Sequence, residues 1–462
     1  MHGGRLRLLA VAVAVAILAL GAAACRRNTL GPRASDRRES LLADLGFVAL
    51  CPGLLLIAAT AVRAGPGLSA ADPFLVAGVL LLVADLVLSP RETPVVPRWL
   101  IVAGGAILLT GLVSAVFADR FGQNLLPAAR FAVALSVGTA AIAVAASTPK
   151  RRTIIAGLWV TAAAISALIA VADSVFGTEI GPRLTGLVFN AGARVGGLAN
   201  HPNQLAAAAV IALPVALAYA GAPRIRASER WVAIGLVCVL VAGVLVSGSR
   251  AGAIALPVVV LATAAWAAPG RFRRQQMFVA GALVVAVIAL LVVNPNIASV
   301  TTSRLGASES TAVSDESRRE LMTQAVSHFL DRPLTGHGFA ESRAAHMIYL
   351  QVLAAGGLLA LLAFVLFFAG TISRGRNAMR AVDLPPSDRA LALGCTVAVV
   401  AWMVLGLVQN MLYDRYLYVA PGLVLALAAA VGSRQVVGRQ RDGDQSAASG
   451  GVPPRGPWTA SV

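Results

Sequence analysis

The sequence predicts an all-α, polytopic transmembrane helical bundle of about 12 core helices, or 13 with the first apolar run, and one large external loop containing short amphipathic helices. Hydrophobic residues make up 58% of the 462 residues and charged residues only 13%, with a mean hydropathy of +0.79. A soluble domain carries roughly 25% charged residues. The apolar residues are also grouped in repeated runs near the roughly 20 residues that a helix needs to cross a bilayer.

These apolar runs define the expected spanning helices. In chain order they cover residues 8–24, 45–63, 74–89, 99–117, 129–147, 153–172, 204–222, 231–247, 251–269, 275–294, 347–370, 389–411 and 416–432. Pro214 and Pro257 lie inside two of the runs. Membrane helices tolerate proline because neighbouring helices satisfy the backbone groups that it releases.

The runs divide the chain into five parts. Residues 1–44 form an N-terminal extension whose first run is an extra span, a signal sequence or the product of a misassigned start. Residues 45–294 and 347–432 hold the transmembrane helices, and residues 295–346 form the external loop. The polar tail 433–462 is expected to be cytoplasmic and disordered.

The basic residues predict the orientation. The chain has a net charge of +17, and more than half of its 38 basic residues lie in short segments between alternate spans, in clusters such as Lys150–Arg152. Cytoplasmic loops are enriched in Lys and Arg, so the loop 295–346 is expected outside the cell membrane. Aromatic content is only 5% and the arginines separate apolar runs, which favours the lipid bilayer over nucleic acid as the partner of this charge.

The external loop concentrates arginine and histidine. Ser317 and Glu320 fit a capping box that would start an amphipathic helix at the outer interface, with Leu321, Ala325 and Phe329 on one face. Arg318 and Arg319 would then lie in the first turn, where the helix dipole gives them nothing. A bound anion would explain one of them and solvent the other.

Histidines follow that helix at two places. His337 lies between Gly336 and Gly338, in a bend that could bring backbone close to a ligand. His346 lies where the loop re-enters the membrane, as a capping or interfacial residue or as a proton acceptor near neutral pH.

Three other external segments carry polar residues. Arg194 lies between small residues upstream of Asn200-His201-Pro202-Asn203, a cluster that either caps the next helix or binds ligand. In the turn Ser247–Gly252, Arg250 either sits in a nest of backbone amides that would bind an anion or extends to the lipid headgroups. Arg415 either pairs with Asp414 or binds phosphate.

No cofactor or metal site is predicted. The four cysteines lack metal-ligand spacing, and the external acids form no Asp-x-Asp pair of the kind that holds a metal in sugar-nucleotide transferases. The chain also lacks a phosphate-cradling glycine loop. Acids within the spans are nearly absent apart from Asp85, which argues against an ion-driven transporter.

Four segments together resemble the O-antigen ligase and polymerase family of polysaccharide-assembling membrane proteins. They are RVGGLANHPNQLAAAAVIALP (194–214), SGSRAG (247–252), RRELMTQAVSHFLDRPLTGHGF (318–339) and HMIYLQVLAAGGLLALL (346–362). Their order and the single large loop before the last helices match that family, over about residues 180–432. Within the last segment, His346 and Gly357 fit the spacing of the family pattern.

The resemblance implies an inverting, metal-independent glycosyl transfer at the external face. The donor would be a glycan on undecaprenyl diphosphate, held by Arg194, Arg250 and one of Arg318 and Arg319. His346 would accept the proton of the attacking hydroxyl. The acceptor would be a growing glycan, a glycolipid, a cell-wall polymer or a protein, so ligation and polymerisation both fit.

Two functions from other classes are also compatible with the sequence. A transporter or flippase of a lipid-linked saccharide would need a central polar cavity and would not depend on one external histidine. A non-catalytic scaffold of a polysaccharide assembly complex would tolerate neutral replacement of Arg194, Arg250 and His346 together.

Overall fold

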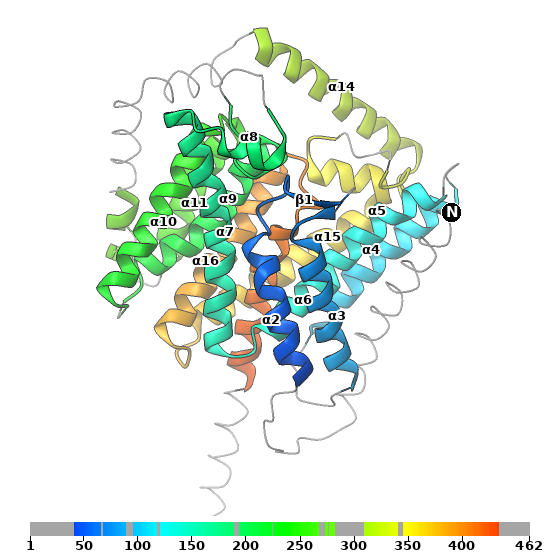
Figure 1. The fold of residues 1–462 in the computed structure, drawn as a ribbon. Helices are drawn as coiled ribbons and strands as arrows, with labels where there is room; N and C mark the ends of the chain where they lie inside the picture. The colour runs from blue at the N-terminus through cyan, green and yellow to red at the C-terminus, as the bar shows by residue number, and fades with distance from the viewer. Residues whose placement is uncertain are drawn as a thin grey trace, which may run out of the picture.

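The computed structural model describes residues 41–65, 68–88, 96–117, 121–188, 194–223, 225–267, 273–275, 277–281, 309–340 and 345–433. The expected run 8–24, most of the run 275–294 and the tail beyond Ser433 lie outside these residues. The described chain is a bundle of helices whose only strands, β1 (Arg63–Gly65) and β2 (Leu68–Ser69), pair as a short antiparallel ribbon (Figure 1). The predicted all-α transmembrane bundle is therefore confirmed.

Eight of the described helices are long and apolar enough to cross a membrane. They are α4 (Arg98–Val116), the joined helices α5 (Phe121–Val133), η1 (Ala134–Gly138) and α6 (Thr139–Ala145), α7 (Pro149–Phe176), α9 (Pro202–Ala220), α10 (Ala227–Val246), α15 (Ile348–Arg380), α16 (Pro386–Gly406) and the C-terminal helix Arg415–Ser433. The shorter apolar helices α2 (Leu41–Leu55) and α11 (Arg250–Trp266) and the 17-residue α3 (Asp72–Leu88) lie beside them.

Several helices extend past the apolar runs because polar residues cap them. For α7, the Thr148 hydroxyl accepts the Arg151 N–H, Pro149 occupies the first turn, and Gly177 ends the helix in the left-handed conformation. This helix was expected over 153–172 and is longer at both ends. The helix expected over 45–63 ends earlier than predicted, because α2 stops at Leu55 and turns follow.

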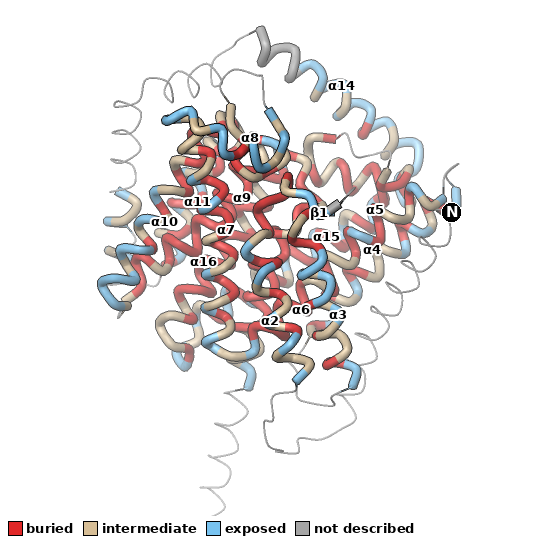
Figure 2. Tube along the Cα trace, in the orientation of Figure 1, coloured by how far each residue is buried: buried red, intermediate tan, exposed pale blue. Residues whose placement is uncertain are grey.

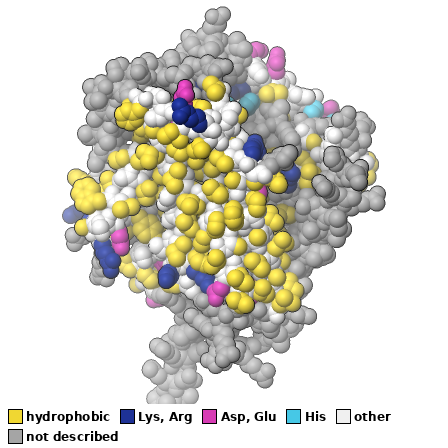
Figure 3. Space-filling view, in the orientation of Figure 1, with side chains coloured by type: hydrophobic (Ala, Val, Ile, Leu, Met, Phe, Trp, Pro, Cys, Tyr) yellow, Lys and Arg dark blue, Asp and Glu magenta, His cyan; other side chains and the backbone are white. Residues whose placement is uncertain are grey.

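Helix α9 lies at the centre of the bundle. It packs against α7, α10, α11 and α16. Of its most apolar 18 residues, 83% are buried inside the protein, compared with 44% for α4 and for α10. Figure 2 shows the buried residues concentrated along the bundle axis. On the outside, apolar side chains cover the middle of the face drawn in Figure 3, and Lys and Arg gather towards its two ends. That distribution suits a lipid-facing belt between two polar surfaces.

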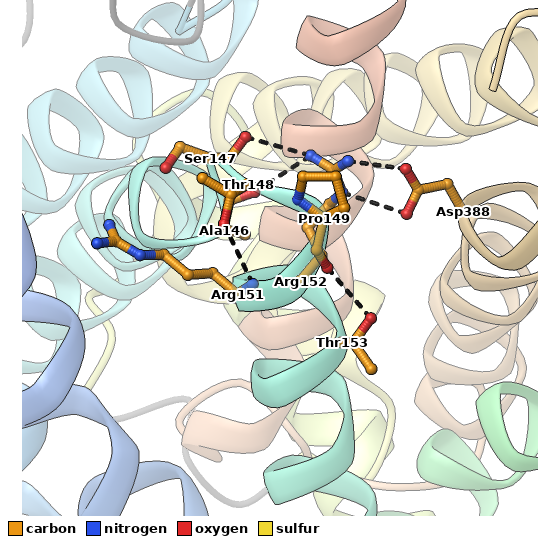
Figure 4. Close-up of polar contacts among 8 residues, drawn as sticks. All are labelled: Ala146, Ser147, Thr148, Pro149, Arg151, Arg152, Thr153 and Asp388. Carbon is orange, nitrogen blue, oxygen red and sulfur yellow. Dashed lines mark hydrogen bonds and ion pairs between the residues drawn. The ribbon is translucent and has the colours of Figure 1, made fainter. Parts of the chain in front are cut away.

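The end of the bundle that was predicted to be cytoplasmic holds a buried ion pair (Figure 4). Arg152, 1% exposed, donates from Nη2 to Asp388 Oδ2 at 2.7 Å and from Nη1 to the Ser147 carbonyl at 3.3 Å. Asp388 is itself only 3% exposed. The pair joins the first turns of α7 and α16. Charges so deeply buried need this pairing, so it fixes how the two helices meet.

Helix α14 (Glu309–Asp331) lies at the opposite end, as does the short helix α8 (Ile180–Thr185), and α14 packs against α15 (Figure 1). The predicted capping box was wrong, because the helix begins at Glu309 and Ser317 lies inside it. The predicted apolar face is present: Ala325 is buried against Ala345 and Ala354. Arg318 and Arg319 consequently lie near the middle of the helix.

Helix α15 is broken at Gly357, and the segment after α14 fills the break. Gly357 has φ +69° and ψ −168°. Its neighbour Leu358 donates its N–H to the Pro333 carbonyl at 2.9 Å, while His337 and Gly338 donate theirs to the carbonyls of Ala354 and Ala355. The segment thus satisfies backbone groups that the break removes from the helical pattern, as burial in a membrane protein requires.

Candidate functional site

A cavity of about 260 Å³ lies where α9, α11, α14 and the end of α16 meet, at the α14 end of the bundle. Three arginines from separate elements line it, and the other lining residues are small, polar or apolar. The lining comprises Arg194, Asn203, Gly248, Ser249, Arg250, Ala251, Ile254, Arg318, Val408 and Gln409. Four of the residues predicted from the sequence, Arg194, Arg250, Arg318 and Asn203, thus come together in one cavity.

Arg194 is held in place from two sides. Its Nε donates to the Ser247 carbonyl at 3.0 Å, and its Nη2 donates to Asn203 Oδ1 at 2.7 Å. Asn203 belongs to the first turn of α9, and Ser247 ends α10. The planar guanidinium of Arg194 is thus held in a fixed orientation, and such a group suits phosphate oxygens.

The turn before α11 is built to start that helix at the cavity. Gly248 adopts φ +60°, and the Ser249 hydroxyl accepts the Gly252 N–H at 3.3 Å as the helix cap. Gln409 Nε2 approaches the same hydroxyl at 3.4 Å. Arg250 is the first residue of the helix. The positive end of the helix dipole therefore adds to the charge of the arginines at the cavity.

The structure separates the two neighbouring arginines of α14. Arg318 lines the cavity, whereas the side chain of Arg319 is 79% exposed and approaches Glu316 at 3.7 Å. Adjacent helical residues point about 100° apart, so only one of the two can face the bundle.

Two histidines lie within electrostatic range of these arginines. His201 caps α9, because its Nδ1 accepts the Asn203 N–H at 3.1 Å. Burial, reinforced by the charges of Arg194, His346 and Arg318, lowers the pKa of His201 to about 4. Burial and the charge of Arg318 also lower the pKa of His346. Both imidazoles are therefore neutral near pH 7 and able to accept a proton.

His346 lies just before Met347, the residue that caps α15 and whose carbonyl accepts the Gln351 N–H. Its electrostatic effect on His201, and that of Arg318 on both rings, joins the predicted proton acceptor to the arginine cavity. His346 itself does not line the cavity, so its link to the cavity is the electrostatic effect of Arg318.

Other predicted residues lie elsewhere. Arg415 does not line the cavity and forms an ion pair with Asp72, in place of the suggested pair with Asp414. His337 stacks on His328, with ring centres 4.6 Å apart.

Gly336 and Gly338 pack against protein in this structure. A Cβ on Gly336 would lie 2.4 Å from the Ala355 carbonyl carbon, and one on Gly338 would lie 2.5 Å from Asn124 Oδ1. The close backbone approach predicted for this bend is therefore an approach to α15 and α5.

Sequence reasoning missed the residues that hold the start of α9. Asn200 accepts from Arg63 Nη2 at 2.9 Å, and Gln204 connects Thr60 to Asp414. Thr60 and Arg63 are separated from Asn200 by about 140 residues of chain, so no local pattern linked them. The polar residues Asn200, Asn203 and Gln204 around one helix start were the available signal.

Comparison with known proteins gives one family match. The O-antigen ligase family model matches residues 234–365, a range that includes Arg250, Arg318 and His346. No curated protein matches the chain.

Proposed function

Because residues 234–365 match the O-antigen ligase family, we propose that this chain is a membrane glycosyltransferase of that family. It would transfer or polymerise glycan from an undecaprenyl-diphosphate donor onto an acceptor hydroxyl at the external face. The reaction would be metal-independent and would invert the anomeric carbon. The observation that carries this proposal is the convergence of Arg194, Arg250 and Arg318 on one cavity, together with the electrostatic effect of Arg318 on His346.

The cavity suits a diphosphate. Three guanidinium groups and the N-terminus of α11 provide positive charge, and they come from elements whose positions are fixed by caps and neutral hydrogen bonds. Such preorganised charge binds the donor and also stabilises the negative charge that develops on the departing diphosphate. Arginine could therefore fill the role that a divalent cation fills in many sugar-nucleotide transferases.

One wall of the cavity suits a lipid. Ile254 and Val408 line it and are 57% and 42% exposed, and Leu261 further along α11 is 68% exposed. Arg250, Ile254 and Leu261 follow helical spacing, so they share one side of α11. A polyprenyl chain could lie along this side while its diphosphate occupies the cavity.

His346 is the proposed general base. Its lowered pKa keeps the ring neutral at physiological pH. The acceptor hydroxyl would give its proton to the imidazole as its oxygen forms a bond to the anomeric carbon. The bond from that carbon to the diphosphate oxygen breaks, and undecaprenyl diphosphate leaves as an anion held by the arginines. Attack opposite to the leaving group inverts the anomeric centre.

The external placement rests on the positive-inside rule. The cavity lies where α16 ends, whereas the Arg152–Asp388 pair lies where α16 begins, so the two are at opposite ends of the bundle. Because basic loops stay in the cytoplasm, the cavity would face outward. A transport or scaffold function would use the same membrane fold but would not need a neutral imidazole beside the arginines.

The test is transfer in vitro. Purified protein in nanodiscs receives radiolabelled undecaprenyl-diphosphate glycan, a panel of acceptors and a metal chelator. We expect glycan transfer with release of undecaprenyl diphosphate by the wild type, and a loss of at least about 100-fold for His346→Ala and Arg250→Ala. Arg319→Ala is the matched control, since that side chain is exposed. Equal transfer by all variants, or none by the wild type, would refute the proposal.

A further inference from the structure

A chain of hydrogen bonds runs beneath the start of α9, and all of its bonds point the same way. Arg63 Nη2 donates to Asn200 Oδ1 at 2.9 Å, and the Asn200 N–H donates to Thr60 Oγ1 at 3.0 Å. The Thr60 hydroxyl donates to Gln204 Oε1 at 3.3 Å. Gln204 Nε2 then donates to Asp414 Oδ1 at 3.1 Å. The chain begins at a cation and ends at a carboxylate.

The carboxylate fixes this direction. Asp414 is 8% exposed, and its second oxygen accepts the Tyr416 hydroxyl at 3.2 Å. An ionised carboxylate only accepts hydrogen bonds, so Gln204 must turn its amide NH₂ towards it. The Gln204 oxygen then faces Thr60 and accepts the proton of its hydroxyl. The Thr60 oxygen in turn accepts the Asn200 N–H. A neutral carboxyl or an amide at 414 would remove the reason for this order.

The hydrogen-bond chain holds the first turn of α9, which contributes to the cavity wall. Gln204 lies in the first turn of α9, next to Asn203, whose Oδ1 accepts from Arg194 at 2.7 Å. His201 caps the same turn through Asn203 N–H. A shift of this turn would therefore move both the support of Arg194 and the imidazole beside it.

We propose that Asp414 is a positioning residue for the donor diphosphate: through Gln204 its carboxylate holds the first turn of α9, and so holds Arg194 in its binding position. Asp414 does not line the cavity, so its proposed role is exerted through Gln204. This inference rests on the proposed function, because it assigns a support to the same diphosphate site.

The charged surroundings give the proposal a pH dependence. The ionisable groups that interact with Asp414 are Tyr416, Tyr418 and Arg415, and Arg415 is itself paired with Asp72. Burial raises the pKa of Asp414 to about 6, against the opposing effects of the Tyr416 hydrogen bond and the Arg415 charge. The carboxylate is thus ionised at neutral pH and becomes neutral as the pH falls through about 6.

A purely electrostatic role and a positioning role of Asp414 predict opposite changes in diphosphate binding when its charge is removed. If Asp414 acted only as a negative charge near an anion site, removing that charge would tighten binding of a diphosphate. If it positions Arg194, removing the charge weakens binding because the hydrogen-bond chain loses its order. The sign of one binding change therefore separates the two roles.

The experiment measures binding of an undecaprenyl diphosphate ester of one N-acetylhexosamine to the full chain in nanodiscs. The diphosphate diester keeps its charge across the pH range used. We expect Asp414→Asn to weaken binding about tenfold at about pH 7.5, and Thr60→Val, of similar shape, to weaken it about threefold. Wild-type binding should weaken reversibly towards about pH 5.5, while Asp414→Asn stays flat.

The controls separate this inference from the proposed function. Thr371→Val removes another buried hydroxyl, which donates within α15, and should leave binding unchanged. Loss of binding in Arg194→Ala with wild-type or tighter binding in Asp414→Asn would overturn the inference alone. Wild-type binding by Arg194→Ala and Arg250→Ala would overturn the proposed site as well. Should Asp414→Asn fail to fold, unchanged binding in Thr60→Val and on acidification of the wild type would still overturn the inference.

Discussion

Leu358 donates its backbone N–H to the carbonyl of Pro333 at 2.9 Å, which joins the middle of a transmembrane helix to the segment that follows α14. The bond is possible because α15 is broken one residue earlier, at Gly357. The helix that carries Arg318 and the helix that begins after His346 are thereby tied together.

Gly357→Ala should destabilise the protein. Its φ of +69° disfavours any side chain, and an added Cβ would lie 2.3 Å from the Leu334 carbonyl carbon. We expect a cost of at least about 2 kcal/mol and a lower midpoint of thermal unfolding in detergent. Gly235→Ala is the control, because a Cβ there meets nothing within 4 Å in a regular helix. Equal midpoints for the two variants would contradict this account of the break.

Activity should persist at pH values below the ordinary pKa of histidine. Burial and Arg318 lower the pKa of His346 from 6.5, so the ring stays neutral, and able to accept a proton, until the pH falls through this lowered value. Activity is then lost on the acid side. Arg318→Gln removes one of the two causes and should move the acid midpoint of kcat upwards, towards 6.5. The rate is measured at saturating donor, and a midpoint that stays or falls would count against His346 as the base.

The buried pair of Figure 4 should be essential for folding. Asp388→Ala leaves the Arg152 charge buried and should cost about 3–5 kcal/mol in unfolding free energy. Asp44→Ala breaks a pair whose carboxylate is 44% exposed, so its cost should stay below about 1 kcal/mol. Replacing Arg152 and Asp388 together by leucine should recover most of the loss. No recovery in the double variant would show that the pair has a further role.

The outer side of α14 should contact lipid. Met322, Val326 and Leu330 are 38%, 43% and 69% exposed and are spaced four residues apart, so they form one apolar stripe. We expect a fluorophore on a cysteine at Leu330, in a cysteine-free background, to be quenched by lipid-attached nitroxide. The exposed Ser327, off the stripe, is the control position. Equal quenching at both positions would place the helix away from the bilayer surface.

From the sequence one can predict which residues lie at the membrane surfaces, but less well which of their side chains contact one another. Arg194, Arg250 and Arg318 each stand beside an apolar run on the predicted external face, so their meeting in one cavity follows from topology. To predict which of Arg318 and Arg319 faces the cavity, one must know where α14 begins. The helix begins eight residues before the expected capping residue Ser317. Its first turns are polar and lack the apolar period that would have indicated a helix.

Side-chain pairs between residues far apart in the chain could not be predicted from the sequence. Arg415 binds Asp72 across 343 residues, although Asp414 is its sequence neighbour. Local spacing favours the neighbour, but burial turns Asp414 towards Gln204 and Tyr416 instead. The break at Gly357 was likewise hidden, because a glycine in an apolar run predicts only a weak point in a helix.

The hydrogen bond between Gln204 and Asp414 spans 210 residues, from the central helix α9 to the residue that precedes the helix Arg415–Ser433. During synthesis the first turn of α9 enters the membrane long before its partner carboxylate exists. If Asp414 positions Arg194 as proposed, a chain that ends before residue 414 would carry Arg194 without this support. The proposed support of Arg194 thus depends on a contact that forms only after a much later part of the chain has been made.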